Sequence, residues 1–339
     1  MPNLERVLSL LEVTTTIEHT QNFIRSINPD IPSSANSWVD LRGRIENAVT
    51  ARSISMGQLT QFVAETEECA RQQIIWYSCD PAYVREVVAD LETRARRVRL
   101  QLNVERSVLT APRTPAIVLV GSRPEELKLK LVERREWWEP VSDLIEGREG
   151  AKIRTKQFRQ QSARAVVCLR VEVPTGLGWL HVQKVEATRI EYNTIEEAWR
   201  VFAPLVEQAR FQPFDLSRAF EPLLASDEVI RKKGNIFDAG GRPISFGTRG
   251  SATDDFIQSG FWSRSATEEE FTTRNLGLSW KENGNQLESP LLTFISSMPE
   301  QIGGGKRRAD EPISAVYINR HCVRSEITHV IERLRHFNR

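Results

Sequence analysis

"LKLKLVERREWW" occupies residues 127–138, and its apolar and charged side chains alternate along the chain. Alternation with a period of two is typical of a β-strand that buries one face and exposes the other. The leucines of this stretch share one face, and Lys128, Lys130 and Arg134 lie nearer the opposite face. "ARAVVCLRVEV", at residues 163–173, repeats the pattern. Both stretches therefore predict strands that, within one sheet, would give it an apolar face and a basic face.

Other stretches after residue 99 also have strand character. The turn "PTGLG" at 174–178 predicts that residues 163–173 pair with a strand at 180–186. Gly240–Gly241 and Asn283–Gly284 are turn signals that predict two more hairpins. Further strands are expected at residues 100–104, 115–120, 290–295 and 313–318.

The chain before residue 98 shows the 3.6-residue periodicity of helices, interrupted by Pro29 and Pro32. The helices expected over the whole chain are 3–13, 37–50, 56–70, 80–98, 194–209, 215–225 and 324–337. We therefore predict an α+β fold. Residues 1–98 form an N-terminal helical bundle, a possible protein-docking domain. Residues 99–339 form a mainly antiparallel β-sheet domain with flanking helices and a basic sheet face.

The net charge of +1 hides an uneven distribution of charge. Residues 1–90 carry 7 Arg or Lys and 12 Asp or Glu, residues 91–170 carry 18 and 10, and residues 171–339 carry 21 and 23. The middle of the chain is therefore basic and lies between two mildly acidic segments. This asymmetry predicts a polyanionic partner, or a basic segment that binds another acidic surface.

The basic middle segment is the candidate binding surface. Residues 148–170 hold seven cationic side chains and one acidic one. Cations at alternate positions of a strand are roughly 6.6 Å apart, comparable to the step between phosphates of an extended nucleic-acid backbone. Trp137, Trp138 and Phe158 are close in sequence, and aromatic side chains beside cations suit stacking with single-stranded nucleic acid. The predicted nucleic-acid-binding residues are Lys128, Lys130, Arg134, Lys152, Arg154, Lys156, Arg159, Arg164 and Arg170.

These observations favour a cytoplasmic, non-catalytic binding protein. Its basic sheet would engage nucleic-acid backbone, with DNA preferred over RNA, and its helical bundle would dock a protein partner or a second copy. A DNA-associated or antiviral defence complex is the context that we expect. The simplest alternative for the basic strands is a solvated sheet face, with Trp137 and Trp138 covering core. Another is a docking surface for the acidic N-terminal domain of a neighbouring chain. Two further functions stay open: an interaction scaffold without nucleic-acid binding, and a metal-dependent nuclease or hydrolase.

Catalytic motifs in the chain are incomplete. "HCVRSEIT" at 321–328 begins like the loop of a cysteine phosphatase, but Thr328 stands where the phosphate-gripping arginine is required. "GGGK" at 303–306 lacks the spacing and the Ser or Thr of a nucleotide-binding P-loop.

Candidate metal ligands are equally dispersed. Glu126 and Lys128 match half of a nuclease motif, which also needs an aspartate such as Asp90 or Asp143 on a neighbouring strand. The five histidines, His19, His181, His321, His329 and His336, are far apart in sequence. His329 and His336 share a helix face about 10 Å apart, which is too far for one ion. A polar loop ending in Asp254 and Asp255 could bind a cation or a ligand. We expect no metal and no cofactor.

The cysteines and the apolar segments bear on the compartment. Cys69, Cys79, Cys168 and Cys322 are widely separated, which predicts reduced thiols in a cytoplasmic protein. No apolar run approaches the roughly 18 residues of a membrane helix, and the first 13 residues lack the features of a signal peptide. We therefore expect no membrane partner.

Overall fold

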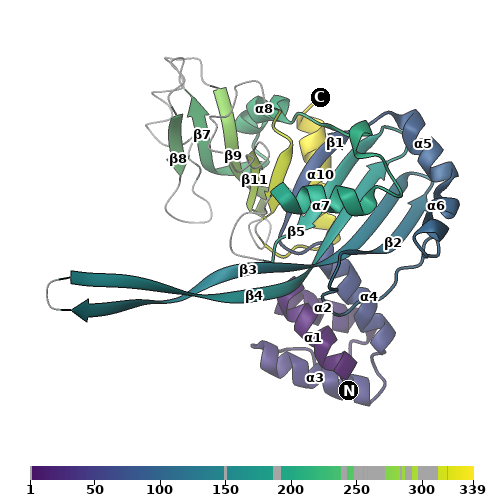
Figure 1. Ribbon diagram of the computed structural model, residues 1–339, viewed down its shortest axis with the longest axis vertical. Coiled ribbons are helices and arrows are strands. Elements are labelled where there is room, and N and C mark those ends of the chain that lie inside the picture. The colour runs from purple at the N-terminus through teal and green to yellow at the C-terminus, as the bar shows by residue number, and fades with distance from the viewer. Residues whose placement is uncertain are drawn as a thin grey trace.

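A computed structural model gives the fold of the chain (Figure 1). The structure describes residues 2–148, 151–185, 192–237, 243–247, 255, 258, 272–282, 285–286, 292–296, 312–318 and 320–339. Within these residues, N-terminal helices precede a mainly antiparallel sheet that carries further helices. The predicted α+β fold class is confirmed.

Several helices begin where the sequence supplies a capping side chain. The hydroxyls of Thr16, Ser37 and Ser55 each accept a hydrogen bond from a backbone N–H three residues later, and Asp80 caps the helix that Pro81 opens. The helices are α1 (Pro2–Thr14), α2 (Ile17–Ile27), α3 (Trp38–Thr50), α4 (Met56–Glu67), α5 (Pro81–Ala89), α6 (Leu91–Arg97), α7 (Tyr192–Phe202), α8 (Phe220–Ala225) and α10 (Arg324–Phe337), with 3-10 turns η1 (Gln208–Arg210) and η2 (Ser217–Ala219).

The described strands form one sheet in the order β2-β3-β4-β5-β1-β12-β11-β9-β7-β8, and the paired strands are antiparallel. The short strands β6 and β10 pair with β1 and β9. The strands are β1 (Gln72–Ser78), β2 (Ala116–Arg123), β3 (Glu126–Arg148), β4 (Ala151–Glu172), β5 (Leu177–Gln183), β6 (Gln212–Pro213), β7 (Val229–Phe237), β8 (Pro243–Gly247), β9 (Thr272–Glu282), β10 (Asn285–Gln286), β11 (Leu292–Ser296) and β12 (Ala315–Ile318).

Helices α1 to α4 enclose a hydrophobic core of their own, which includes Leu8, Leu11, Leu41 and Leu59. Helices were expected at the positions of α1, α3 and α4, and the structure confirms them. Helix α2 was not anticipated, because its sequence, IEHTQNFIRSI, is largely polar. In the structure only Thr20 and Ile24 of this helix are fully buried. Its N-cap signal at Thr16 was nevertheless present in the sequence.

Strand β1 ties the first hundred residues to the sheet. It lies between β5 and β12, so a segment assigned by sequence to the helical domain 1–98 is a central strand. Its consecutive apolar residues point alternately to opposite faces. Ile75 and Tyr77 join one core with α5, α6 and α7, and Ile74 and Trp76 join another with α8 and α10. Residues 72–78 are therefore part of the sheet, and their side chains contribute to both of its cores.

Most predicted strands are confirmed, and several predicted elements differ. The single helix expected at 80–98 is two helices, α5 and α6, and the helix expected at 215–225 is the 3-10 turn η2 followed by α8. Residues 100–104 are turn and coil, and only Leu100 of that stretch belongs to the core. Helix α7 ends at Phe202, several residues before the expected end at 209. The β7–β8 and β9–β10 pairs are hairpins as expected, although their turns lie outside the described residues.

The turn between β4 and β5 needs a glycine at position 176. Gly176 has a φ of +69°, and a Cβ atom there would lie 2.0 Å from the carbonyl oxygen of Cys79. The backbone N–H of Cys79 donates a 2.9 Å hydrogen bond to the carbonyl of Gly176. This close approach joins the β4–β5 turn to the segment that precedes α5.

Candidate nucleic-acid interface

Strands β3 and β4 form a long two-stranded arm that projects from the body of the protein (Figure 1). The pairing of β3 with β2 ends at Val132, and the pairing of β4 with β5 begins at Val167. Between these points, residues 133–148 and 151–166 pair with each other, and within the described residues no third strand pairs with them. We call these residues the arm. Sixteen residues of extended strand span about 50 Å. The arm therefore carries the middle of the basic segment away from the body.

The strand register places eight of the nine predicted positions on one side of the β3–β4 ribbon. On β4 these positions share one alternation, and on β3 Lys128, Lys130 and Arg134 pair with Arg170, Cys168 and Arg164 of that same side. Arg159 falls on the other side, in register with Glu139. The eight positions are Lys128, Lys130, Arg134, Lys152, Arg154, Lys156, Arg164 and Arg170.

At the base of the arm this side is covered by the end of α4. The Lys128 Nζ lies 2.6 Å and 2.8 Å from the two carboxylate oxygens of Glu68. The Lys130 Nζ lies 3.2 Å from Glu68 and 2.6 Å from Glu105, and its side chain is fully buried. Both predicted phosphate ligands are therefore occupied by carboxylates of the same chain.

The two arginines at the base of β4 are paired in the same way. The Arg170 guanidinium lies 2.6 Å from Glu68 and 3.1 Å from Glu126. Arg164 forms an ion pair with Glu67, and its Nε donates a 2.7 Å hydrogen bond to the carbonyl of Val108. A fifth cation from α10 reaches Glu68 at 3.2 Å. We call this set the Glu68 cluster: carboxylates Glu67, Glu68, Glu105 and Glu126 with cations Lys128, Lys130, Arg164, Arg170 and Arg324.

The charges of this cluster hold one another in place. Burial by itself would raise the pKa of Glu68, but Lys130, Lys128 and Arg170 together bring it far below its ordinary value of 4.5. Burial would likewise lower the pKa of Lys130, and the surrounding carboxylates raise it instead. Nearby His181 is buried too, and burial with the charge of Arg170 lowers its pKa to about 3. Glu68 is thus held ionised and nearby His181 neutral, whereas burial raises the pKa of Glu67 despite the opposing charges of Arg164 and Lys130.

The Glu68 cluster attaches the acidic N-terminal helices to the basic strands. The uneven charge distribution had indicated that the basic segment could bind another acidic surface, and Glu67 and Glu68 belong to the acidic N-terminal segment of this same chain. Sequence reasoning did not single out these two glutamates. The signal that could have found them was the net negative charge of residues 1–90, read together with the basic strands.

The middle of the arm and the part just before it expose two large aromatic side chains. Trp138 is 65% exposed and Phe158 is 53% exposed. Trp138 pairs in register with Gln160, two residues from Phe158, so the two aromatics are diagonal neighbours on the side that carries the predicted cations. Trp137 is only partly exposed and belongs to the other side. Trp138 and Phe158 are therefore accessible to a partner.

The two strands of the arm differ in charge. Residues 151–166 of β4 hold five cationic side chains and no acidic one. Residues 133–148 of β3 hold three cationic side chains and five acidic ones. Arg134 lies 2.8 Å from Glu136, and Arg159 is exposed. The register places Lys152, Arg154 and Lys156 opposite Gly147, Ile145 and Asp143. The side chains of 152, 154 and 156 lie outside the described region of the structure.

Cys322, Glu126 and Asp90, from the phosphatase-like and nuclease-like motifs, are buried or ion-paired. Cys322 is buried, and burial raises the pKa of its thiol, so it is not an activated nucleophile. Glu126, half of the nuclease motif, pairs with Arg170, and Asp90 pairs with Arg94 at 3.2 Å. Among the described side chains, no group of three or more histidine, cysteine, aspartate or glutamate residues could hold a metal ion.

The remaining predicted ligands serve local structure or lie outside the described residues. Asp255 binds Arg231 at 2.7 Å, and His329 packs edge-on against Trp280. The GGGK segment and Asp254 lie outside the described residues. In the portion of the chain that the structure describes, no helix has the length and apolarity needed to cross a bilayer.

Searches against models of protein families and against curated proteins gave no match. The candidate function therefore depends on the geometry of the chain itself.

Proposed function

We propose that this chain is a non-catalytic binding protein of the cytoplasm that engages nucleic acid through the arm. The observation that carries the proposal is the pair of exposed aromatics, Trp138 and Phe158, beside a strand segment whose charged residues are all cationic. Bases stack on aromatic faces, and cations bind the phosphates between them. The four cysteines are free thiols, which supports a reducing compartment.

Ion pairs at the base of the arm limit which of the predicted cations are available to phosphates. Lys128, Lys130, Arg164 and Arg170 are committed to carboxylates, so we assign phosphate contacts to the outer cations at 152, 154, 156 and 159. Four phosphate contacts predict a slope of log K against log salt near −3 for single strands and near −3.6 for duplex. DNA is the polyanion that we propose, and RNA of the same sequence is the comparison.

The test measures fluorescence anisotropy of labelled single-stranded DNA, duplex DNA and RNA against salt concentration. Trp138→Ala should weaken single-strand binding by roughly 5- to 150-fold without changing the slope, because one stacking contact contributes about 1–3 kcal/mol. Replacing Lys152, Arg154 and Lys156 together by alanine should reduce the single-strand slope by about 2. A double Arg96→Ala and Arg200→Ala variant removes exposed cations elsewhere on the surface and serves as the control.

Two results would count against nucleic-acid binding by the arm. One is a binding constant that does not depend on salt. The other is equal loss of binding in the control and in the triple variant, which would indicate attraction by net charge alone.

A second candidate function is an interaction scaffold in which a protein covers the arm. It is favoured by the fact that the arm is a two-stranded ribbon over residues 133–148 and 151–166, since isolated ribbons of this kind are marginally stable in water. A partner captured by the wild-type chain but not by Trp138→Ala, with no binding of DNA or RNA at low salt, would favour the scaffold.

A further inference from the structure

The outer edge of β4 is open along the arm (Figure 1). In the body of the protein β5 pairs with β4, but that pairing begins at Val167, and among the described residues no strand pairs with residues 151–165 on this side. An open edge is a template on which an extended segment of another chain can form a further strand. This edge is a different surface from the flat side of the arm to which we assign nucleic acid.

Even-numbered residues of this part of β4 direct their backbone N–H and C=O groups to the open edge. In an antiparallel ladder these groups of successive residues point to opposite neighbours. The N–H of Val166 donates a 2.9 Å hydrogen bond to the side-chain oxygen of Gln183 in β5, whereas the N–H of Val173 donates 3.0 Å towards β3, to the carbonyl of Glu125. The even-numbered residues from 152 to 164 therefore face the open edge, and no proline interrupts residues 151–166.

The charge of the strand selects the kind of segment that fits this edge. Residues 151–166 carry five cationic side chains and no acidic one. Arg164 is paired with Glu67, and the remaining cations are at positions 152, 154, 156 and 159. Three of these positions share one side of the strand. Opposite charges directly across a strand pair stabilise the pair, so the edge favours a strand with acidic residues at alternate positions.

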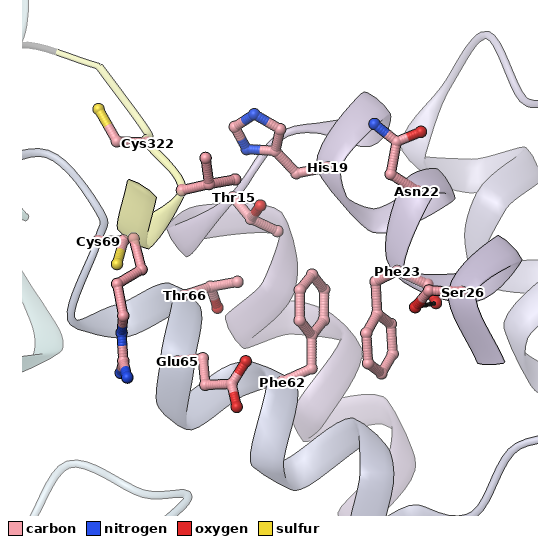
Figure 2. Close-up of a pocket in the computed structure, with 12 residues that line it drawn as sticks. Thr15, His19, Asn22, Phe23, Ser26, Phe62, Glu65, Thr66, Cys69 and Cys322 are labelled. Atoms are coloured by element: carbon pink, nitrogen blue, oxygen red, sulfur yellow. Dashed lines mark hydrogen bonds between the residues drawn. The ribbon is translucent and has the colours of Figure 1, made fainter. Parts of the chain in front are cut away.

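The cavity between α2, α4 and α10 offers a charged partner less than the arm does (Figure 2). Its volume is about 420 Å³, and both the arginine and the glutamate of its wall already have partners. Arg324 contacts Glu68 at 3.2 Å, and Glu65 accepts a 3.2 Å hydrogen bond from Gln61. The β4 edge, in contrast, presents backbone donors and acceptors with which no strand of the described region pairs.

A second copy of this chain is a poor occupant of the β4 edge. Two such edges paired with each other would bring together segments that contain cations and no acidic residue, and like charges across a strand pair are destabilising. We propose that the β4 edge of the arm binds an extended acidic segment of another protein. The segment adds a strand through backbone hydrogen bonds and places alternate carboxylates beside the cations of β4.

The test uses a fluorescently labelled peptide of six Glu-Thr repeats, because threonine favours strands and the glutamates of a strand then share one face. This peptide is long enough to reach residue 160 in any register that stays on the edge. Anisotropy titrations with the full chain should show saturable binding below about 1 mM. The same peptide with every backbone nitrogen methylated keeps its charge but has no donors, and should bind about tenfold more weakly or less. Hydrogen exchange should show protection by the peptide in residues 151–166 and not in residues 133–148.

Gln160→Pro removes one outward N–H in the middle of this edge and leaves the pairing with β3 intact. It should weaken peptide binding by about fivefold or more, because a backbone hydrogen bond is lost. Glu136→Pro is the matched control. The Gln160 side chain donates a 3.0 Å hydrogen bond to Glu136, so both variants lose that bond, but residue 136 directs its N–H to the opposite edge, on β3. Glu136→Pro should leave peptide binding unchanged or strengthen it, because an acidic side chain is removed.

Absence of saturable peptide binding to the wild-type chain would overturn the proposal. So would equal binding of the methylated peptide, which would indicate attraction by charge alone, or equal weakening by the two proline variants. Dimers in which residues 151–166 become protected without peptide would identify a second copy as the occupant instead. The melting temperature of each variant separates loss of binding from loss of fold, and the exchange pattern of the wild-type chain tests the edge without any substitution. Trp138→Ala, which tests nucleic-acid binding, should leave peptide binding unchanged, so the two surfaces are tested separately.

Discussion

Replacing Glu68 by glutamine should destabilise the fold more than any other single change of charge described above. The side chain is 4% exposed and contacts Lys128 at 2.6 Å, Lys130 at 3.2 Å and Arg170 at 2.6 Å. It also contacts Arg324 at 3.2 Å. Glutamine keeps the shape of the side chain but removes the charge that these four cations share.

The size of the destabilisation depends on which carboxylates remain beside each cation in the Glu68→Gln variant. Lys130 keeps Glu105 and Arg170 keeps Glu126, whereas Lys128, which is 17% exposed, loses the carboxylate that holds it. Removing one partner of a buried ion pair typically costs about 3–5 kcal/mol, because the remaining charge is left uncompensated. We expect a loss in this range in the free energy of unfolding, with a fall in melting temperature of roughly 4–7 °C for a chain of this length.

The assay is urea-induced unfolding followed by tryptophan fluorescence. Glu92→Gln is the control, because Glu92 pairs with Arg96 on the surface at 64% and 75% exposure, and such pairs contribute about 0–1 kcal/mol. The pKa of Glu68 is lowered in the fold, so its contribution is complete above the ordinary pKa of 4.5 and is lost as the pH falls below it. The difference between Glu68→Gln and wild type should therefore shrink in acid. Equal unfolding midpoints for Glu68→Gln and Glu92→Gln would refute the reasoning.

Two further predictions concern the sheet. Because the pKa of buried His181 is lowered from 6.5 to about 3, its contribution to stability should be complete above pH 6.5 and decline towards pH 3, and His181→Gln should flatten that decline as measured by urea midpoints. A pH profile that His181→Gln leaves unchanged would contradict this reasoning. Gly176→Ala should lower the unfolding free energy by more than about 2 kcal/mol, because its Cβ would lie 2.0 Å from a backbone oxygen and its φ is positive. Gly43→Ala in α3, with no atom within 4 Å of the added Cβ, should be neutral or stabilising, and similar melting temperatures for the two alanine variants would contradict the steric argument.

The sequence predicted elements well where one periodicity extends over many residues. The alternation in 127–138 and 163–173 identified β3 and β4, and the two strands do pair with each other. The alternation did not reveal the arm. Alternation shows that the two faces of a strand differ in exposure, but it does not show whether a third strand pairs with the strand's edge. The run at 74–77 was ambiguous for the same reason, since a strand buried on both faces has no alternation to detect.

The candidate site was only partly predictable. The register places most of the predicted positions on one side of the ribbon, and their role in binding stays a prediction. Two of the acidic residues at the base of that side, Glu67 and Glu68, come from the end of α4, some 60 residues away from Lys128. A local pattern cannot show such a partner, because the contact depends on how α4 packs against the sheet. The exposure of Trp138 likewise depends on the arm leaving the body, which no local signal indicates.

The irregularity of β3 near the middle of the arm limits how another chain can approach it. The register shifts between Pro140 and Ser142, and proline has no backbone N–H to donate to an added strand. Open edges of ribbons otherwise recruit strands from other copies and cause aggregation, and interruptions of this kind prevent continuous pairing along the edge. A strand from another chain therefore cannot pair without interruption along the free edge of β3, so continuous edge-to-edge association of the arm has only the edge of β4 open to it.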